Sequence, residues 1–422
     1  MPRIVSKHQA PVFLLVALLI TGTPLAAEDW PTWRGVHVDG VTPETGFPLE
    51  WSAEKNVRWK VALEDGSSMP LVIGDHVLLT TTRNEGKRRS LLCLNRATGA
   101  ELWESGVDYA EKERTHDGNP YCSSSPACDG ERVYVWHSSA GLFCYNLEGE
   151  ELWRKDLGKF EHIWGYASSP AVWGDVVIVN AGPGLRAFVA AFDKLSGEEV
   201  WRFETPEFRS KEVEEFRGSW STPVVRRMAG RDQLLLSMPD RLHSLDPADG
   251  KEIWSCAGMG KLVYTSPLVE GEIVVAMSGY HQPALAVRAD GTGDVTQTHR
   301  LWHHAERNPQ RVGSGLVHNG HIYMVNEPGS VFCIELKSGE KKWEARAGGK
   351  TWSSLSRAGD RFYMNFMNGD TTVFRATPEG YEELAVNSLG ETTRASLAFS
   401  EGEIFQRTYG HLYCISEQPA AP

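Results

Sequence analysis

The sequence lacks the residue patterns that usually indicate a metal or haem centre. It has seven cysteines in 422 residues, but no two are adjacent, and neither a C-x-x-C pair nor a C-x-x-C-H haem attachment site occurs. The motifs H-E-x-x-H, G-x-S-x-G and the P-loop are missing as well. The sequence therefore predicts no catalytic residue, no metal site and no bound cofactor.

The cysteines do not form a disulfide framework either. Four of them, Cys93, Cys144, Cys333 and Cys414, occupy the same place in recurring phrases such as LLCLN and LFCYN, where a small apolar residue is wanted. Cys122 and its neighbour in sequence, Cys128, lie too far apart along an extended strand to be bridged without a sharp bend. We expect all cysteines to be free thiols.

Positive charge is also in short supply. The chain has 43 Lys and Arg residues against 55 Asp and Glu residues, which gives a formal net charge of −12. Binding to nucleic acid needs a basic face. The composition excludes nucleic acid as a probable partner class.

No apolar run is long enough to span a bilayer, which takes about 20 residues. The longest run near the amino terminus is the nine residues from Val12 to Ile20, preceded by Arg3 and Lys7 and followed by the small residues Ala26 and Ala27. This pattern is typical of a secretory signal peptide over residues 1–27. We expect an exported protein, periplasmic or secreted, that neither spans a membrane nor carries a lipid anchor, because the first cysteine is Cys93.

Glycine and tryptophan are abundant instead, with 41 and 15 residues. The stretch 123–158 shows how they are used, because it reads as four short strands separated by glycine-bearing turns. Its last phrase, Gly-x-x-x-Trp, recurs at intervals of about 40–50 residues. We expect these tryptophans to pack between repeats. The tryptophans of the series are Trp59, Trp103, Trp153, Trp201, Trp254, Trp302 and Trp343.

A second phrase opens each repeat with Ser or Thr before Pro, as in Ser124-Ser125-Pro126, and we expect these side chains to satisfy backbone groups near the axis. Openings occur near residues 67, 123, 167, 220, 264, 313, 352 and 395. The last repeat lacks a fourth strand, and the strand-like segment 57–61 lacks the preceding three. Pairing these two leftovers would close a ring and remove its exposed edges. The sequence thus predicts an all-β, eight-bladed propeller of four-stranded blades closed by the amino-terminal strand. Seven blades are the fallback, and an open solenoid is the competing architecture.

The predicted organisation has four parts. The signal peptide (1–27) precedes an irregular lead-in (28–56), the propeller (57–416) and a short tail (417–422). We expect Trp30, Trp33 and Trp51 of the lead-in to lie across the outside of the propeller and attach it there.

The repeats resemble those of the PQQ-binding-like, quinoprotein-type β-propellers, to which the BamB-like family is related. The resemblance rests on the Ser-Ser-Pro openings and on runs such as 93–103 (CLNRATGAELW) and 191–201 (AFDKLSGEEVW). It implies PQQ-dependent oxidoreduction with calcium or scaffolding in envelope assembly, and the family also includes many exported proteins of no known activity. The dehydrogenases carry an adjacent cysteine pair over the quinone, which this chain lacks, and only Gly118-Asn119-Pro120 resembles a fragment of one of their calcium motifs.

The residues just before each opening do not repeat, and in a propeller they line the central funnel. Several are cationic, which suits a carboxylate, a phosphate or an acidic peptide, and several are aromatic, which suits stacking on a flat ring or a sugar. We expect a monomeric, non-catalytic propeller that binds a protein partner or a small anionic ligand at this funnel, unless the charges are merely paired with Glu214, Glu215 and Glu327. The candidate residues are His116, Asn119, Tyr121, His162, Trp164, Arg217, Trp220, Lys261, Arg311, Lys350, Trp352 and Arg394.

Overall fold

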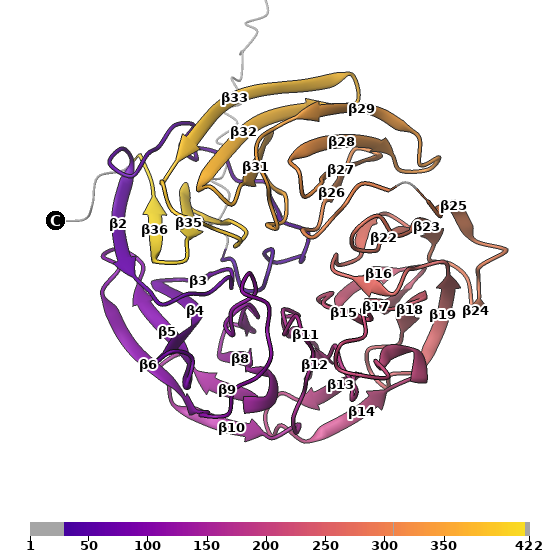
Figure 1. The fold of residues 1–422 in the computed structure, drawn as a ribbon, viewed down its shortest axis with the longest axis horizontal. Coiled ribbons are helices and arrows are strands. Elements are labelled where there is room, and N and C mark those ends of the chain that lie inside the picture. Colours follow the sequence, from indigo (N-terminus) through magenta and orange to yellow (C-terminus); the bar gives the residue numbers. More distant parts are fainter. Residues whose placement is uncertain (1–28, 307, 418–422) are drawn as a thin grey trace, which may run out of the picture.

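The computed structural model describes residues 29–306 and 308–417. These residues form a ring of eight four-stranded blades around a central axis (Figure 1), so the predicted all-β, eight-bladed propeller is confirmed. The helical content of the described residues is two 3-10 turns, η1 (Ser138–Ala140) and η2 (Pro206–Phe208). No helix in this part of the chain is long and apolar enough to cross a membrane. The predicted signal peptide lies outside the described residues.

Each blade runs outward from the axis in antiparallel strands. Blade 1 consists of β3 (Leu71–Ile73), β4 (His76–Arg83), β5 (Arg88–Asn95) and β6 (Glu101–Asp108), and blade 2 of β7 (Ala127–Cys128), β8 (Arg132–Trp136), β9 (Leu142–Asn146) and β10 (Glu151–Lys155). Blade 3 consists of β11 (Ala171–Trp173), β12 (Val176–Ala181), β13 (Phe188–Asp193) and β14 (Glu199–Phe203), and blade 4 of β16 (Val224–Met228), β17 (Arg231–Ser237), β18 (Arg241–Leu245) and β19 (Glu252–Ala257). Blade 5 consists of β21 (Leu268–Glu270), β22 (Ile273–Met277), β23 (Ala284–Arg288) and β25 (Arg300–His304), and blade 6 of β26 (Leu316–His318), β27 (His321–Val325), β28 (Ser330–Glu335) and β29 (Lys341–Arg346). Blade 7 consists of β30 (Ser356–Ala358), β31 (Arg361–Asn365), β32 (Asp370–Thr377) and β33 (Gly380–Ser388), and blade 8 of β34 (Ala398–Ser400), β35 (Glu403–Arg407), β36 (His411–Ile415) and β2 (Val57–Ala62). Four short strands supplement the blades: β1 (Val41–Thr42), β15 (Gly218–Ser219), β20 (Leu262–Val263) and β24 (Gly293–Asp294).

The amino-terminal strand closes the ring as the repeat pattern predicts. Strand β2 pairs antiparallel with β36, so that Trp59 lies opposite Cys414 and Ala62 opposite His411. Blade 8 is therefore built from both ends of the propeller chain. Because the ring is closed, every blade packs between two neighbours and none lies at an open end.

The repeated tryptophans join neighbouring blades. The indole of Trp153 in blade 2 donates to the carbonyl of Lys194 in blade 3 at 2.9 Å. Gly197 of the same turn has a φ of +70°, and a Cβ there would lie 2.7 Å from the Trp153 ring. The Gly-x-x-x-Trp phrase thus couples the glycine of one blade to the tryptophan of the blade before it. Trp254 departs from this pattern and donates to Gln233 of its own blade at 2.7 Å, and the segment of blade 5 beside it forms β24, in which Gly293 lies opposite Trp254.

The lead-in does not run only along the outside of the propeller, as expected, but also crosses its axis. Trp30 exchanges backbone hydrogen bonds with Val72 of blade 1 at 2.8 and 3.1 Å. Strand β1 then pairs in parallel with the innermost strand of blade 7, β30. Trp30 and Trp51 are buried in the core around the closure, at 1% and 3% exposure, whereas Trp33 lines a cavity on the axis. The lead-in therefore seals one end of the central channel.

Arg34 anchors this seal. Its side chain is fully buried and donates to the carbonyls of Gly315 at 2.6 Å and Leu355 at 3.1 Å, which belong to blades 6 and 7, as well as to Asp39 at 2.6 Å. Gly40 has a φ of +77°, and a Cβ there would lie 2.9 Å from this guanidinium. One buried arginine thus holds the lead-in against two blades.

Replacing Trp153 by Ala should lower the free energy of unfolding by about 3–5 kcal/mol, the usual cost of truncating a buried aromatic residue. Urea unfolding followed by circular dichroism measures this. The neighbouring Leu152 is 46% exposed and supplies the matched control, since Leu152→Ala should cost less than about 0.5 kcal/mol. Equal losses for the two variants would contradict the role of Trp153 between the blades.

Replacing Arg34 by Ala should release the lead-in from the axis, because the carbonyls of Gly315 and Leu355 lose their charged donor and remain buried. Hydrogen exchange of residues 35–42 should accelerate strongly while exchange in the blades changes little. Arg114→Ala is the control, because Arg114 is exposed and pairs with Glu214 at the surface. Unchanged exchange over residues 35–42 would show that other contacts hold the lead-in.

Candidate functional site

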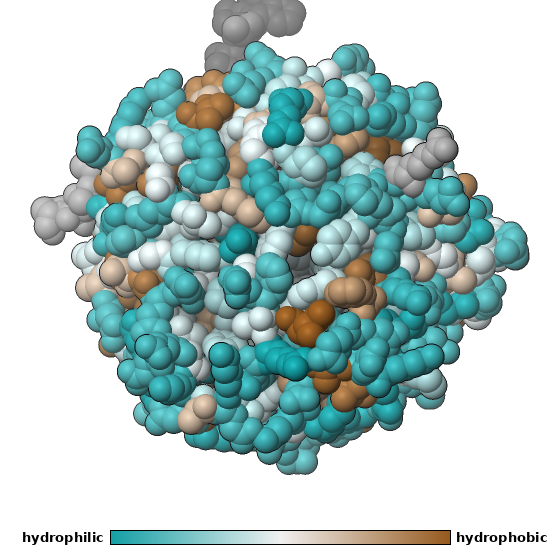
Figure 2. All heavy atoms as spheres, viewed as in Figure 1, coloured by the Kyte–Doolittle hydropathy of each residue, from teal (hydrophilic) through white to brown (hydrophobic). Residues whose placement is uncertain are grey.

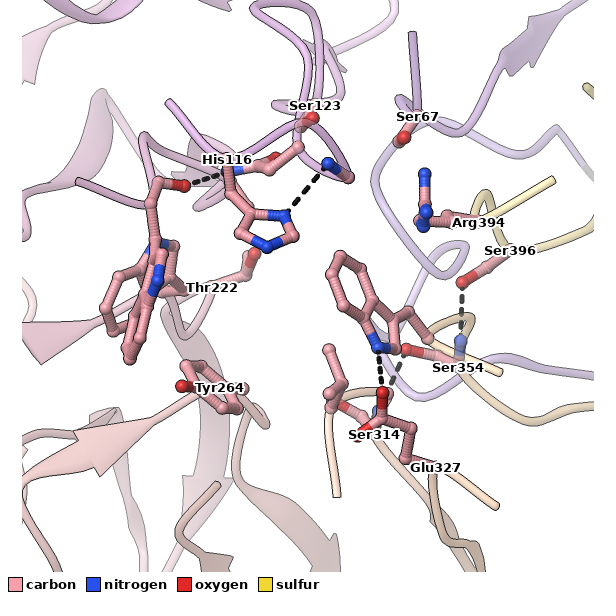
Figure 3. Close-up of a pocket in the computed structure, with 18 of the residues that line it drawn as sticks. Ser67, His116, Ser123, Thr222, Tyr264, Ser314, Glu327, Ser354, Arg394 and Ser396 are labelled. Carbon is pink, nitrogen blue, oxygen red and sulfur yellow. Dashed lines mark hydrogen bonds between the residues drawn. The ribbon is translucent and has the colours of Figure 1, made fainter. Parts of the chain in front are cut away.

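A cavity of about 390 Å³ lies on the axis of the ring, a size usual for a small-molecule site. Trp33 of the lead-in belongs to its lining, and the remaining walls come from the blades (Figure 3). The residues that line it are Trp33, Ser67, His116, Gly118, Asn119, Ser123, Trp164, Ala167, Trp220, Thr222, Tyr264, Tyr280, Gln310, Val312, Gly313, Ser314, Glu327, Lys350, Trp352, Ser354, Arg394 and Ser396.

A chain of hydrogen bonds between the repeat openings surrounds the axis. In each bond, a backbone amide of one blade donates to the Ser or Thr hydroxyl of the next blade. The donor–acceptor pairs are Met69–Ser125, Ser125–Ser169, Ser169–Thr222, Thr222–Ser266, Ser266–Ser314, Ser314–Ser354 and Ser354–Ser396, at 2.8 to 3.1 Å. The expectation that these side chains satisfy backbone groups near the axis is met, and the bonds do so across blades.

One wall of the cavity is aromatic. Trp220 and Tyr264, from the loops before blades 4 and 5, have ring centroids 5.1 Å apart at an interplanar angle of 62°. Trp164 lies 5.8 Å from Trp220 and 6.1 Å from Tyr280. Phe216, which is 59% exposed, stacks on Trp164 at 5.0 Å. Figure 2 shows apolar residues gathered beside the centre of a face that is otherwise largely hydrophilic.

The opposite wall carries charge, as Figure 3 shows for Glu327 and Arg394 across from Tyr264. The Glu327 carboxylate is buried and accepts from Lys350 at 2.8 Å, from the Trp352 indole at 2.9 Å and from Gln310. Its oxygens are therefore committed to groups of the protein. The ion pair with Glu327 neutralises the charge of Lys350.

Arg394 has no such counter-charge. Its guanidinium lies between two rings, 4.8 Å from the centroid of Trp352 and 5.0 Å from that of Tyr409. Within residues 29–306 and 308–417, its buried Nε and Nη1 atoms have no hydrogen-bond partner. Burial lowers the pKa of Arg394 below its ordinary value, without an opposing carboxylate. Oγ of Ser67 is also buried without a partner in this part of the chain.

The structure brings seven of the twelve candidate residues together in the cavity lining. These are His116, Asn119, Trp164, Trp220, Lys350, Trp352 and Arg394. The Asn119 amide donates to the carbonyls of Trp164 and Tyr166 at 2.6 and 3.1 Å, and so joins two of the loops. The His116 ring lies 5.8 Å from Trp352.

The other five candidates lie outside the lining. Arg311 is buried and donates to the carbonyls of Ser278 and Gln282. Arg217 pairs with Asp240 at 2.5 Å.

The remaining three also have other surroundings. His162 is buried beneath Trp220, with ring centroids 5.0 Å apart, and burial lowers its pKa. Tyr121 lies under the guanidinium of Arg89 at 4.1 Å, and Lys261 is exposed. The predicted convergence of five cations thus reduces to two, Lys350 and Arg394, at the cavity.

Three residues of the site were missed or given only a passing role. Tyr280 follows β22, and Glu327 follows β27, so both lie in loops between the second and third strands of their blades. In an antiparallel blade those loops reach the same face as the loops before the first strand. This topology was the available signal for Tyr280 and Glu327, and the repeat pattern marks Ser67, which lies two residues before Met69 as Arg394 lies two residues before Ser396.

The dehydrogenase resemblance implies a quinone with calcium, and the residues present do not fit that group. Glu327 is the one carboxylate among the lining residues, and its oxygens are committed as described. In the described part of the chain, no group of three or more His, Cys, Asp or Glu side chains could hold a metal ion. All seven cysteines are buried and free, which confirms the prediction of free thiols.

The known proteins that this chain resembles include both BamB and quinohemoprotein alcohol dehydrogenases. A family model described as outer membrane protein assembly factor BamB matches residues 87–213 and 186–418. The quinohemoprotein alcohol dehydrogenase ADH IIB of Pseudomonas putida is 22% identical over 294 residues, which cover 64% of this chain and 42% of the relative. The chain thus spans less than half the length of this curated relative.

Solved structures share the fold at low identity. BamB from Moraxella catarrhalis superposes with a TM-score of 0.59 and 14% identity, over 85% of this chain and 98% of the other. The quinohemoprotein alcohol dehydrogenase from Comamonas testosteroni gives a TM-score of 0.68 and 11% identity, over 93% and 82% of the two chains. Since the family model matches most of its length, the chain belongs to the PQQ-like propeller family described as outer membrane protein assembly factor BamB.

Proposed function

We propose that this protein is an exported, monomeric and non-catalytic propeller whose axial cavity binds an anionic group of a small ligand or of a protein partner. The observation that carries the proposal is Arg394, a partly buried guanidinium in the cavity lining with no carboxylate to balance it. An unpaired charge removed from water is costly to the protein alone. A bound carboxylate or phosphate would supply the missing partner.

The surroundings of Arg394 favour binding with little rearrangement. Trp352 and Tyr409 flank the guanidinium, and the Trp352 indole is itself fixed by its hydrogen bond to Glu327. The orientation of the donor atoms is therefore set before a ligand arrives, which lowers the entropic cost of binding. The protein as a whole carries a formal charge of −12, so the attraction of an anion has to be local.

The aromatic wall supplies the apolar part of the site. Trp164, Trp220, Tyr264 and Tyr280 offer ring surface across the cavity from Arg394. A ligand with a ring and an anionic group at opposite ends would contact both walls at once. This arrangement binds and orients, and it offers no free carboxylate or cysteine thiol for chemistry.

The proposal is tested by measuring the melting temperature with a panel of carboxylates, phosphate esters and acidic peptides. At least one member should raise the melting temperature of the native protein, and Arg394→Ala should abolish that shift with little effect on stability in the ligand-free state. Arg217→Ala is the matched control, because Arg217 lies outside the cavity lining and pairs with Asp240. A shift that survives in Arg394→Ala, or no shift with any member, would refute an anion site at Arg394.

A scaffold function in envelope assembly is the second candidate, and the family match favours it. Capture of partners from an envelope extract by the tagged protein tests it. Enrichment of an outer-membrane protein would support the scaffold, and its absence would count against it.

The third candidate, a PQQ-dependent oxidoreductase, draws on the relatives alone. Reconstitution with PQQ and calcium, followed by dye reduction with alcohols or sugars, would overturn the non-catalytic proposal if activity appears. We expect no activity, because the lining offers no donor set for the metal.

A further inference from the structure

The corner of the cavity between blades 8 and 1 holds polar atoms that have no partner among the residues the structure describes. These are Nε and Nη1 of Arg394 and Oγ of Ser67, all buried within the described part of the chain. Arg394 precedes blade 8 and Ser67 precedes blade 1, and Figure 3 draws both on the same side of the cavity. Buried donors without acceptors cost free energy, so this corner is suited to hold the oxygen atoms of a ligand.

The charge of the corner selects the kind of anion. Lys350 is neutralised by Glu327 at 2.8 Å, which leaves Arg394 as the one unbalanced charge among the lining residues. A single carboxylate matches this charge and the planar geometry of a guanidinium. A phosphate monoester carries about 1.5 to 2 negative charges at neutral pH and would leave an excess.

The rest of the lining is rich in hydrogen-bonding groups. Thr222, Ser314, Ser354 and Ser396 each accept a backbone amide, and each hydroxyl hydrogen remains able to donate. Asn119 and Gln310 add amide groups. A ligand without hydroxyl groups would cover these polar atoms without pairing them, which is unfavourable. A hydroxylated ligand would pair them.

The aromatic wall favours a puckered ring over a flat one. Trp220 and Tyr264 are inclined by 62°, Tyr264 and Tyr280 by 71°. Rings inclined in this way do not form the parallel slot that would sandwich a flat fused-ring system. The C–H face of a saturated ring can contact inclined rings of this kind.

We propose that the cavity binds an acidic monosaccharide with one carboxylate, of the hexuronate type. Its carboxylate would bind at Arg394 and Ser67, its hydroxyl groups at the axial Ser and Thr side chains, and its C–H face at Trp220 and Tyr264. This inference rests on the proposed anion site and specifies its ligand class.

Four probes separate the contributions of charge and ring, and isothermal titration with the full-length mature protein measures them. The probes are D-glucuronate, D-glucose, benzoate and D-glucose 6-phosphate. Glucuronate should bind at least about tenfold more tightly than each of the others, a difference well resolved by titration. Tryptophan fluorescence should change with glucuronate, because the sugar would contact the indole of Trp220.

The results with benzoate, with glucose 6-phosphate and with glucuronate itself can each contradict a different feature of the proposed ligand. Benzoate binding as tightly as glucuronate would refute the sugar and keep the anion site, and tighter binding of glucose 6-phosphate would refute the charge count. Absence of glucuronate binding would refute the inference, while the carboxylate and phosphate panel described above would still decide the anion site itself.

Two variants test the corner directly. Ser67→Ala should weaken glucuronate binding several-fold without lowering the melting temperature, because the hydroxyl has no partner among residues 29–306 and 308–417. Ser123→Ala should weaken it less, since the Ser123 hydroxyl already donates to the carbonyl of Pro120 at 2.7 Å. An equal effect of the two variants, or none from Ser67→Ala, would contradict the assignment of the carboxylate to this corner.

Discussion

The seven amide-to-hydroxyl bonds around the axis are the interaction on which the rest of the propeller depends. Each fixes the start of one innermost strand to the next, at 2.8 to 3.1 Å. A four-stranded blade cannot bury both of its faces alone, so its stability comes from its neighbours. Because the cavity loops lead directly into these strand starts, the same bonds set the distance between the cavity walls.

The chain of bonds has one irregular position, and the lead-in enters there. Blade 1 carries Met69 where the other blades have Ser or Thr, so it offers no hydroxyl. The backbone amide of Arg34 donates to the Met69 sulfur at 3.3 Å instead, while the Arg34 side chain binds carbonyls of blades 6 and 7. A substitution that looks like a degenerate repeat in the sequence thus coincides with the contact that closes the channel.

The fold was predictable because its determinants recur with a fixed period, as Trp153 and Gly197 illustrate. The cavity was predictable only in part, because the positions that line it recur while the residue types at those positions do not. Arg394 lies two residues before the axial hydroxyl of its blade, Ser396, and lines the cavity, whereas Arg311 lies three residues before Ser314 and binds the carbonyls of Ser278 and Gln282. Adjacent side chains of a nearly extended segment point to opposite sides, so an offset of one residue separates a side chain that lines the cavity from one that turns into the protein.

Arg394 differs from two other buried arginines of the propeller in the groups that surround its guanidinium. Arg34 and Arg311 are more deeply buried, but each donates to backbone carbonyls, although Nε and Nη1 of Arg34 also lack partners among the described residues. Arg394 receives two aromatic rings and no hydrogen-bond acceptor within the described residues. Cation–π contacts offset only part of the cost of removing a guanidinium from water. The propeller therefore holds one cation in its cavity lining without a counter-charge among the described residues, and the anion proposed above would supply that counter-charge.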